Sequence, residues 1–219
     1  MDPGILVTAG PTIEPLDPVR YISNHSTGTM GYAIAKECAR KGYRVTLVSG
    51  PASLLSPQKV KVIKVKTALE MKEQVEALVA RHAVLIMAAA VSDFRAAKPR
   101  KNKIKKRNGL VLDLVENPDI LTGLKGNKSV IKIGFALETE KPVENGKKKL
   151  NGKGLDMIVV NTVSSSSNPF GLAGCRTQRG IEYTVIDKGS NVKQYRKMKK
   201  ERMARIVVRE AERLLWMKD

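Results

Sequence analysis

The chain has 219 residues, and 42% of them are hydrophobic, which favours one globular domain with a buried core over a disordered chain. No apolar run is long enough to span a bilayer, and the first residues lack the basic and then apolar pattern of a signal peptide. The net charge of +19 favours anionic partners, either polyphosphates or nucleic acid, but the aromatic content of 4% leaves few platforms for stacking single-stranded bases.

Strands and helices are predicted to alternate through the first half of the chain. A capping box, Thr67 with Glu70, marks the start of the second helix. The run "VLIMAAAV" is continuously apolar, as a parallel strand buried on both faces would be. In chain order we expect a strand at 5–9, a long polar segment at 10–27, a helix at 31–41, strands at 43–48 and 60–65, a helix at 67–81 and a strand at 84–91.

The second half begins with a departure from this alternation. The segment "KNKIKKRNGLVLDLVEN" is typical of a β-hairpin with Asn108-Gly109 in its turn, and we expect a basic two-stranded flap there. Asn117-Pro118 then predicts a helix start, with Asn as the cap and Pro in the first turn. We expect strands at 130–137, 155–161 and 181–187, a connection at 143–153, a polar loop at 164–180 and a long basic helix at 193–216.

This order of elements predicts an α/β fold with a mostly parallel sheet and helices on both faces. No internal repeat and no Gly/Ser linker is present, so we expect one domain over residues 1–219. Ligands of such sheets bind beyond the carboxyl ends of the strands. The candidates placed there are residues 10–31, Asp93 with the basic flap, Phe135, Glu138 and Asn161, although every α/β protein has such residues.

The segment "SNHSTGTMG" is the first candidate. Ser26 and Gly28 stand at the start of a helix, where free backbone N–H groups and the helix dipole suit a phosphate. An ordinary capped helix would have the same residues. The lysine of a Walker P-loop is absent.

Lysines form the second set of candidates. Strand alternation would place Lys103 and Lys105 on one face of the flap, above a ligand, although a lysine-rich strand is more often a solvated sheet edge. Lys149 and Lys153 would share a face if their segment is helical, and two ammonium groups side by side repel unless an anion lies between them. For an isolated pair, extension of both into water is the simpler expectation.

The sequence gives little support for a disulfide, a metal site or nucleophilic catalysis. The chain has two cysteines, Cys38 in a helical pattern and Cys175 in a loop, so we expect no structural disulfide and a reducing cytoplasm as its location. No cluster of Cys and His has the spacing of a metal site, and no nucleophile stands with a base. An enzyme built this way would act by positioning its substrates and stabilising charge.

Six segments, taken in order over nearly the whole chain, resemble phosphopantothenoylcysteine synthetase. They are "VTAGPTIEPLDPVRYISNHSTGTMG", "AAAVSDFR", "KIKK", "NPDIL", "GFALETE" and "KKKLNGKGLDMIVVN". The resemblance implies a Rossmann-like three-layer sandwich, a homodimer, and a ligase of coenzyme A biosynthesis that joins phosphopantothenate to L-cysteine. A nucleoside triphosphate, usually CTP in prokaryotic members with ATP as the alternative, forms an acyl-nucleotide with release of pyrophosphate, and Mg²⁺ accompanies it.

The resemblance also implies roles for particular residues. Asn24 would hold the acyl-nucleotide and orient its carbonyl, with Lys103 reaching the nucleotide from the flap. The phosphopantothenate side would involve Arg20, Asn24 and Ala90. The remaining nucleotide contacts would come from Ser26, Gly28, Ala88, Ala89, Asp93, Pro118, Asp119, Ile120, Leu121, Phe135, Lys149 and Lys153. The metal ligands are not implied. The family's flavin-dependent decarboxylase, fused or separate, is absent from this chain, so no flavin is expected.

Two departures and two rival functions remain. The family commonly has Gly-Gly-Thr where this chain has Gly10-Pro11-Thr12, and lysine where Thr29 stands. An NAD(P)-dependent reductase is disfavoured because no G-x-G-x-x-G follows the first strand and no acidic residue ends the second. A nucleic-acid-binding module rests on the charge and on "KQYRKMKKERMAR" alone, and we expect no specific nucleic acid and no membrane as partners.

Overall fold

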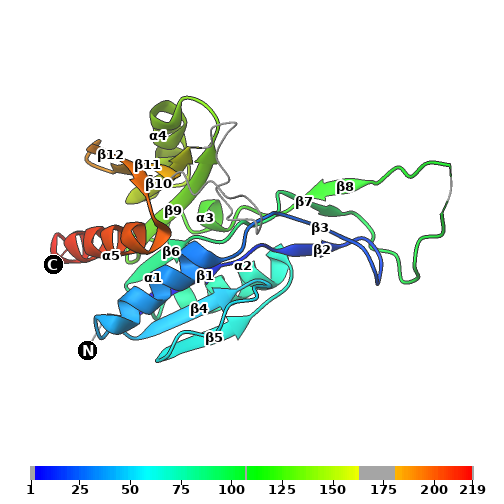
Figure 1. Cartoon of the computed structure of the whole chain (residues 1–219), viewed down its shortest axis with the longest axis horizontal. Helices are drawn as coiled ribbons and strands as arrows, with labels where there is room; N and C mark the ends of the chain where they lie inside the picture. Colours follow the sequence, from blue (N-terminus) through cyan, green and yellow to red (C-terminus); the bar gives the residue numbers. More distant parts are fainter. Residues whose placement is uncertain (1–2, 107, 163–180, 219) are drawn as a thin grey trace.

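A computed structural model describes residues 3–106, 108–162 and 181–218. An eight-stranded sheet runs through the molecule in the order β12-β11-β10-β9-β6-β1-β4-β5 (Figure 1). Its strands are β1 Ile5–Ala9, β4 Val45–Ser49, β5 Val60–Lys64, β6 Val84–Met87, β9 Ile131–Glu138, β10 Met157–Thr162, β11 Ile181–Asp187 and β12 Val192–Met198. All neighbours pair in parallel except β10 with β11 and β11 with β12. The predicted α/β fold with a mostly parallel sheet is confirmed.

Helices cover both faces of this sheet, as the sequence predicts. On one face, α1 Thr29–Arg40 and α5 Lys200–Trp216 pack against each other and against the sheet. On the other face lie α2 Ala68–Val79, α3 Ile120–Gly123 and α4 Pro142–Gly152. Among the described residues, no helix combines the length and the apolar character needed to cross a membrane.

Helix α1 lies unusually close to β1. A Cβ atom added at Gly31 would stand 2.5 Å from the Ala9 Cβ atom and 2.6 Å from the Thr8 carbonyl oxygen, closer than real contacts allow. Glycine at this position therefore lets the first turn of α1 rest on the end of β1. The free N–H groups of that turn are thereby brought to the carboxyl edge of the sheet.

Two small antiparallel hairpins stand outside the main sheet. The first, β2 Ile13–Pro15 with β3 Tyr21–Ser23, lies within the polar segment after β1, where no strand is predicted. The second pairs β7 Phe94–Ala96 with β8 Leu114–Glu116 and forms the base of an arm that projects from the body of the molecule (Figure 1).

The flap differs from its prediction. The strands are only the short β7 and β8, and residues 97–106 and 108–113 form no strand. The expected alternation of Lys103 and Lys105 on a strand face is therefore wrong. Hydrogen bonds to residues 16–20 hold this side of the arm instead: the Ile104 N–H donates to Asp17 Oδ2 over 3.0 Å and the Arg100 N–H donates to the Leu16 carbonyl over 2.8 Å.

Three element boundaries also differ from their predictions. Strand β6 ends at Met87 rather than Val91, because the following residues leave the ladder and bond to hydroxyl groups of Thr8 in β1 and Thr12 in the loop after it. The cap of α3 is Asp119, not Asn117. The helix expected over 193–216 begins at Lys200, because 192–198 pairs with β11 as an edge strand. The predicted polar loop at 164–180, with Cys175, lies outside the described residues.

His82 provides a pH-dependent contribution to folding. Its ring is buried, with Nδ1 2.8 Å from the Leu78 carbonyl oxygen and Nε2 3.1 Å from Thr46 Oγ1. Burial lowers the pKa of His82, so near pH 6 the unfolded chain binds more protons at this residue than the folded chain. Its contribution is therefore complete above the ordinary pKa of about 6.5 and is lost as the pH falls below it.

We expect the free energy of unfolding to fall between pH 7.5 and pH 5.5, and this slope to flatten in the His82→Gln variant. Urea titrations at several pH values measure it. His25→Gln is the matched control, because His25 is exposed, and it should retain the wild-type slope. A slope unchanged by His82→Gln would show that other groups cause it.

Candidate active site

A cavity of about 600 Å³ opens at the carboxyl edge of the parallel strands. The chain leaves β1 for β4 on one side, whereas β6 lies on the other side of β1, so the strand order reverses at β1. Open α/β sheets bind ligands at this point, because the loops that leave the two neighbouring strands diverge there. The cavity lies where the sequence analysis places its candidates.

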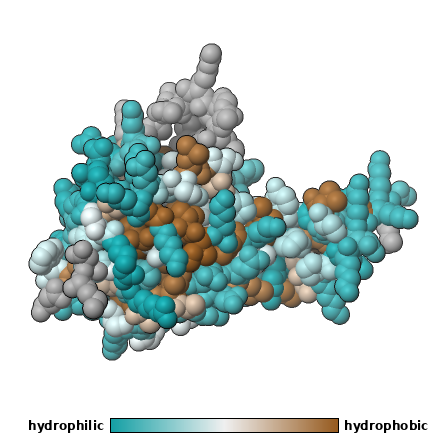
Figure 2. All heavy atoms as spheres, turned by 90° about the horizontal axis from the view of Figure 1, so that it is seen from below, coloured by the Kyte–Doolittle hydropathy of each residue, from teal (hydrophilic) through white to brown (hydrophobic). Residues whose placement is uncertain are grey.

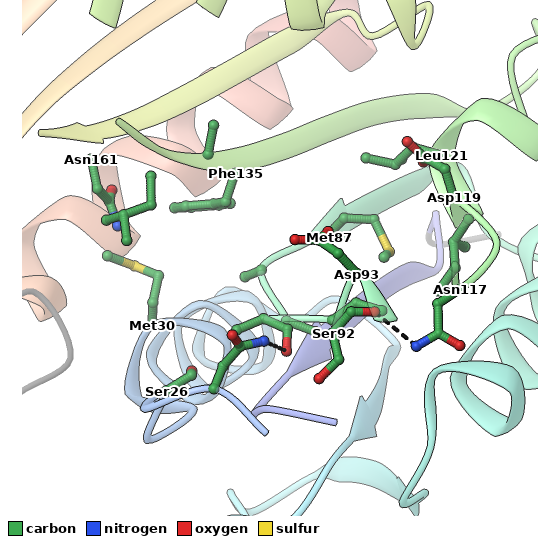
Figure 3. A pocket seen from close by; sticks show the side chains of 18 of the residues that line it. Ser26, Met30, Met87, Ser92, Asp93, Asn117, Asp119, Leu121, Phe135 and Asn161 are labelled. Atoms are coloured by element: carbon green, nitrogen blue, oxygen red, sulfur yellow. Dashed lines mark hydrogen bonds between the residues drawn. The ribbon is translucent and has the colours of Figure 1, made fainter. Parts of the chain in front are cut away.

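The structure brings most of the predicted site residues to this one cavity. Its lining includes Asn24, Ser26, Gly28, Ala88, Ala89, Ala90, Asp93, Pro118, Asp119, Ile120, Leu121, Phe135, Lys149 and Lys153. Arg20 and Lys103 do not line it. Met30, Phe135 and Asn161 lie at one end of the cavity, and Asn117, Asp119 and Leu121 lie at the other (Figure 3).

The start of α1 forms one wall. Gly28 occupies the N-cap with φ 77°, a left-handed conformation that favours glycine, and no side chain caps the helix. Ser26 Oγ accepts a hydrogen bond from the Gly28 N–H over 3.3 Å. The N–H groups of the first turn therefore have no side-chain acceptor, and with the positive end of the helix dipole they suit an anion.

Asn24 joins the loop after β1 to the loop after β6. Its side-chain N–H donates to the Ala90 carbonyl over 2.9 Å, which fixes the amide nitrogen toward that loop. An amide has two N–H donors and one carbonyl acceptor, so one donor and the acceptor are left for a ligand. This geometry is compatible with the predicted role of Asn24, which stays a prediction.

The loop after β6 is itself held by hydroxyl groups of the first strand and its loop. The Ala89 N–H donates to Thr8 Oγ1 over 3.1 Å, and the Ser92 N–H donates to Thr12 Oγ1 over 2.9 Å. The Asn117 side chain donates to the Ser92 carbonyl over 2.9 Å (Figure 3). Asn117 therefore fixes the floor of the cavity beside Asp93 and does not cap a helix.

Asp119 has two structural roles at the far end of the cavity. It caps α3 by accepting from the Thr122 N–H over 3.1 Å, and it pairs with the Lys153 ammonium group over 2.9 Å. Burial alone would raise its pKa, but the hydrogen bonds from Lys153 and Thr122 outweigh burial and lower the pKa of Asp119. The carboxylate stays ionised there and neutralises Lys153.

Lys149 is also neutralised within the protein. Its ammonium group pairs with Glu138 Oε1 over 2.6 Å. Lys149 lies in the last turn of α4 and Lys153 is the C-cap residue of that helix, but a separate carboxylate balances each of them. An anion held between the two lysines is therefore not needed to explain their positions. The sequence analysis offered such an anion or extension of both side chains into water, whereas each lysine is paired with a carboxylate of the protein.

Two polar residues at the opposite end of the cavity have no role among those that the resemblance implies, although the positional rule does point to Asn161. Asn161 lies near the carboxyl end of β10, and its buried Oδ1 atom has no hydrogen-bond partner among the described residues. Lys200, the first residue of α5, also lines the cavity. The position of Asn161 after an apolar strand is a usable signal, whereas Lys200 falls inside a segment predicted as helix and gives none.

Arg20 has a different location from the one its predicted role suggests. One guanidinium nitrogen lies 3.2 Å from Asp17 Oδ2, and another donates to the Ile104 carbonyl over 3.0 Å. The N–H of Ile104 lowers the pKa of Asp17 against the effect of burial, with further contributions from the N–H groups of Val19 and Arg20. Arg20 therefore ties the β2–β3 hairpin to the arm that carries Lys103. The substrate role of Arg20 stays a prediction.

Metal-binding side chains do not gather in the described part of the chain. Within it, no group of three or more His, Cys, Asp or Glu residues has the arrangement to hold an ion. The carboxylates that line the cavity are Asp93, Glu116 and Asp119, and Asp119 is paired with Lys153.

Comparison with known families gives one match that spans most of the chain. Residues 2–214 match the family described as "DNA/pantothenate metabolism flavoprotein C-terminal domain". The coenzyme A biosynthesis bifunctional protein CoaBC of Escherichia coli (strain K12) is 49% identical over 173 residues. That alignment covers 76% of this chain and 42% of the bifunctional protein, so the chain spans less than half of that relative.

Solved structures share the fold. The C-terminal domain of a coenzyme A biosynthesis bifunctional protein CoaBC is 34% identical with a TM-score of 0.82, over 99% of this chain and 97% of that one. A mutant of Cab2, solved in complex with phosphopantothenate-cysteine, is 17% identical with a TM-score of 0.76, over 99% of this chain and 89% of that one. The second likeness shows the fold alone.

Proposed function

The chain belongs to the DNA/pantothenate metabolism flavoprotein C-terminal domain family, and from this premise we propose that it is a phosphopantothenate–cysteine ligase of coenzyme A biosynthesis. The observation that carries the proposal is the cavity at the reversal of strand order. It gathers fourteen residues that the family resemblance assigns, from segments between Asn24 and Lys153. The 49% identity to the bifunctional CoaBC protein supports the same activity.

The reaction proceeds in two steps that balance without any covalent bond to the protein. A carboxylate oxygen of phosphopantothenate attacks the α-phosphorus of the nucleoside triphosphate, and pyrophosphate leaves. The cysteine amine then attacks the acyl carbonyl, the nucleoside monophosphate leaves, and the amine loses a proton. Each step builds negative charge on oxygen, so fixed N–H donors and ammonium groups are the groups that accelerate it.

The cavity supplies these groups at separate places. The free N–H groups at the start of α1 suit the phosphates, and the remaining Asn24 donor suits the acyl carbonyl. Ile120 and Leu121 present α3 toward the base, while Phe135 packs on the nucleotide from β9. We propose CTP as the nucleotide.

Mg²⁺ is proposed to arrive with the triphosphate. The donor set fits that mode, because Asp93 and Glu116 offer carboxylates at the cavity while the described residues form no three-ligand cage. A bound Mg²⁺ would offset charge on the phosphates. The protein's own groups orient the two reacting molecules.

Pyrophosphate release tests the proposal directly. It should appear with phosphopantothenate, L-cysteine and CTP, and should stop when phosphopantothenate is withheld. ATP in place of CTP decides nucleotide preference. Absence of pyrophosphate with either nucleotide, together with an NADPH fluorescence change on binding, would contradict the ligase and favour a reductase.

A second copy of this chain is the proposed partner in solution. The arm exposes apolar side chains, including Leu110 at 55% and Val111 at 96% exposure (Figure 2). Exposed apolar groups gathered on a projection are typical of an interface. The molar mass in solution tests the homodimer. A decarboxylase, fused or separate, is proposed as the enzyme that consumes the product.

Lys103 provides a test of the arm. It is exposed and outside the cavity, so it reaches a nucleotide only if the arm bends over the site or belongs to a second copy. We expect Lys103→Gln to raise the KM for the triphosphate about 10-fold, as loss of one charge-assisted hydrogen bond would. The midpoint of thermal unfolding should not change.

Lys101→Gln is the matched control, since Lys101 is also exposed on the same arm. This variant should leave the KM for the triphosphate within about 2-fold of wild type, because exposed substitutions usually have small effects. Equal effects of both substitutions would mean that the arm acts only through its net charge.

A further inference from the structure

The ammonium groups that line the cavity differ in how they are balanced. Lys149 and Lys153 each have a carboxylate partner, at 2.6 and 2.9 Å. Lys200 has no ion pair among the described residues. An anion entering the cavity competes with Glu138 or Asp119 for the first two lysines, but meets no competing carboxylate partner at Lys200.

Lys200 is also partly removed from water. Its side chain is half-buried at the start of α5, and burial lowers the pKa of its ammonium group, against a smaller raising effect from Glu201. A cation that loses water without gaining a partner is unfavourable for the folded chain. A ligand anion would supply the partner that the fold does not.

The location of Lys200 indicates which anion. Helices α1 and α5 pack against each other on the same face of the sheet, and the first turn of each reaches the cavity. Lys200 lines the cavity from α5 and thus belongs to the layer of helices that carries the uncapped start of α1. Met30 and Asn161, which line the same cavity, lie at one end of it (Figure 3). The paired lysines lie at the C-terminal end of α4 on the opposite face, Lys149 in its last turn and Lys153 as its C-cap.

We propose that Lys200 binds the terminal phosphates of the nucleoside triphosphate and the pyrophosphate that leaves. This inference rests on the proposed ligase function and adds a residue to it. An ammonium group at this position offsets the charge that builds on the leaving pyrophosphate. Lys149 and Lys153, each paired with a carboxylate, would then contact the rest of the nucleotide.

Calorimetric titration of the whole chain tests the assignment without using turnover. Lys200→Met should weaken the binding of inorganic pyrophosphate and of CTP with Mg²⁺ by about 10- to 100-fold, the range for a charge-assisted contact. Binding of CMP should change by less than about 3-fold, because CMP lacks the terminal phosphates. Lys199→Met is the matched control, since Lys199 is the exposed neighbour with the same charge and does not line the cavity.

The outcomes separate this inference from the function on which it rests. A wild-type chain that binds neither pyrophosphate nor CTP nor ATP would contradict the ligase itself. Wild-type pyrophosphate binding that survives Lys200→Met, or an equal loss in Lys199→Met, would overturn the role of Lys200 alone. A loss of affinity confined to phosphopantothenate or cysteine would also overturn the role of Lys200, because it would mean that Lys200 binds an anionic group of those substrates instead.

Folding of the variant is checked separately. Removal of a partly desolvated cation should leave the midpoint of thermal unfolding unchanged or higher. Lys200→Arg retains the charge and should retain at least a third of the wild-type affinity for pyrophosphate, and a loss in Lys200→Arg equal to that in Lys200→Met would argue against a charge contact.

Discussion

Replacing Asn24 with aspartate is expected to slow amide formation by about 10²–10³-fold, the effect of removing one donor aimed at a developing oxyanion. Asn24 donates one N–H to the Ala90 carbonyl and has a second N–H available at the cavity. Aspartate has nearly the same shape but only acceptor atoms. It would face the Ala90 carbonyl with a like partial charge and place an anion beside the phosphodiester of the acyl-nucleotide.

The loss should fall mainly on the second half-reaction. The nucleotide contacts proposed for the residues of α1, α3 and the end of α4 do not involve Asn24, so the acyl-nucleotide should still form and should accumulate. Rapid-quench measurement of acyl-nucleotide and final product in the wild-type and Asn24→Asp proteins separates the two steps. Asn151→Asp makes the same chemical change at an exposed position of α4 outside the cavity and should have wild-type rates.

Equal slowing of both half-reactions, or of neither, would mean that Asn24 has no special role at the carbonyl. Equal slowing of both would in addition indicate that the bond from Asn24 to the Ala90 carbonyl shapes the whole site. That second reading can be checked with Asn24→Ser, which keeps a short donor but does not reach as far.

Replacing Lys132 with methionine is expected to lower the free energy of unfolding by about 2–4 kcal/mol, because it leaves buried carbonyls without their donor. Lys132 is only 3% exposed, because it lies on β9, an inner strand of the sheet. Its ammonium group donates to the carbonyls of Leu124, Lys125 and Asn127 over 3.1, 3.4 and 2.7 Å. These carbonyls follow α3, so Lys132 fixes the end of a helix of only four residues.

Urea unfolding of the Lys132→Met protein measures the loss. Lys128→Met is the matched control, since Lys128 lies in the same loop with an exposed side chain, and it should stay within about 0.5 kcal/mol of wild type. Because α3 presents Asp119 and Leu121 to the cavity, the KM for the nucleotide should rise in Lys132→Met as well. A stability equal to wild type would show that water replaces the ammonium group without cost.

Local pattern was sufficient for the framework of this protein. Continuous apolar runs such as that of β6 mark strands buried on both faces. The Thr67 cap of α2 accepts from the Glu70 N–H over 3.1 Å, as its motif predicts. These signals are reliable because they depend on residues adjacent in the chain. Position after a strand pointed to part of the cavity lining, because parallel strands bring their carboxyl ends to one edge, and the family resemblance supplied the rest.

Contacts between distant segments were decided only by the tertiary structure. The Lys149 pair with Glu138 and the Lys153 pair with Asp119 depend on how α4 lies over β9 and α3. The basic run at 192–198 could equally extend a helix, and it is a strand because β11 offers it a free edge. Lys200 reaches the cavity from the last helix only because α5 packs beside α1. The order of strands and the packing of helices set these distances, and neither leaves a periodic trace in the sequence.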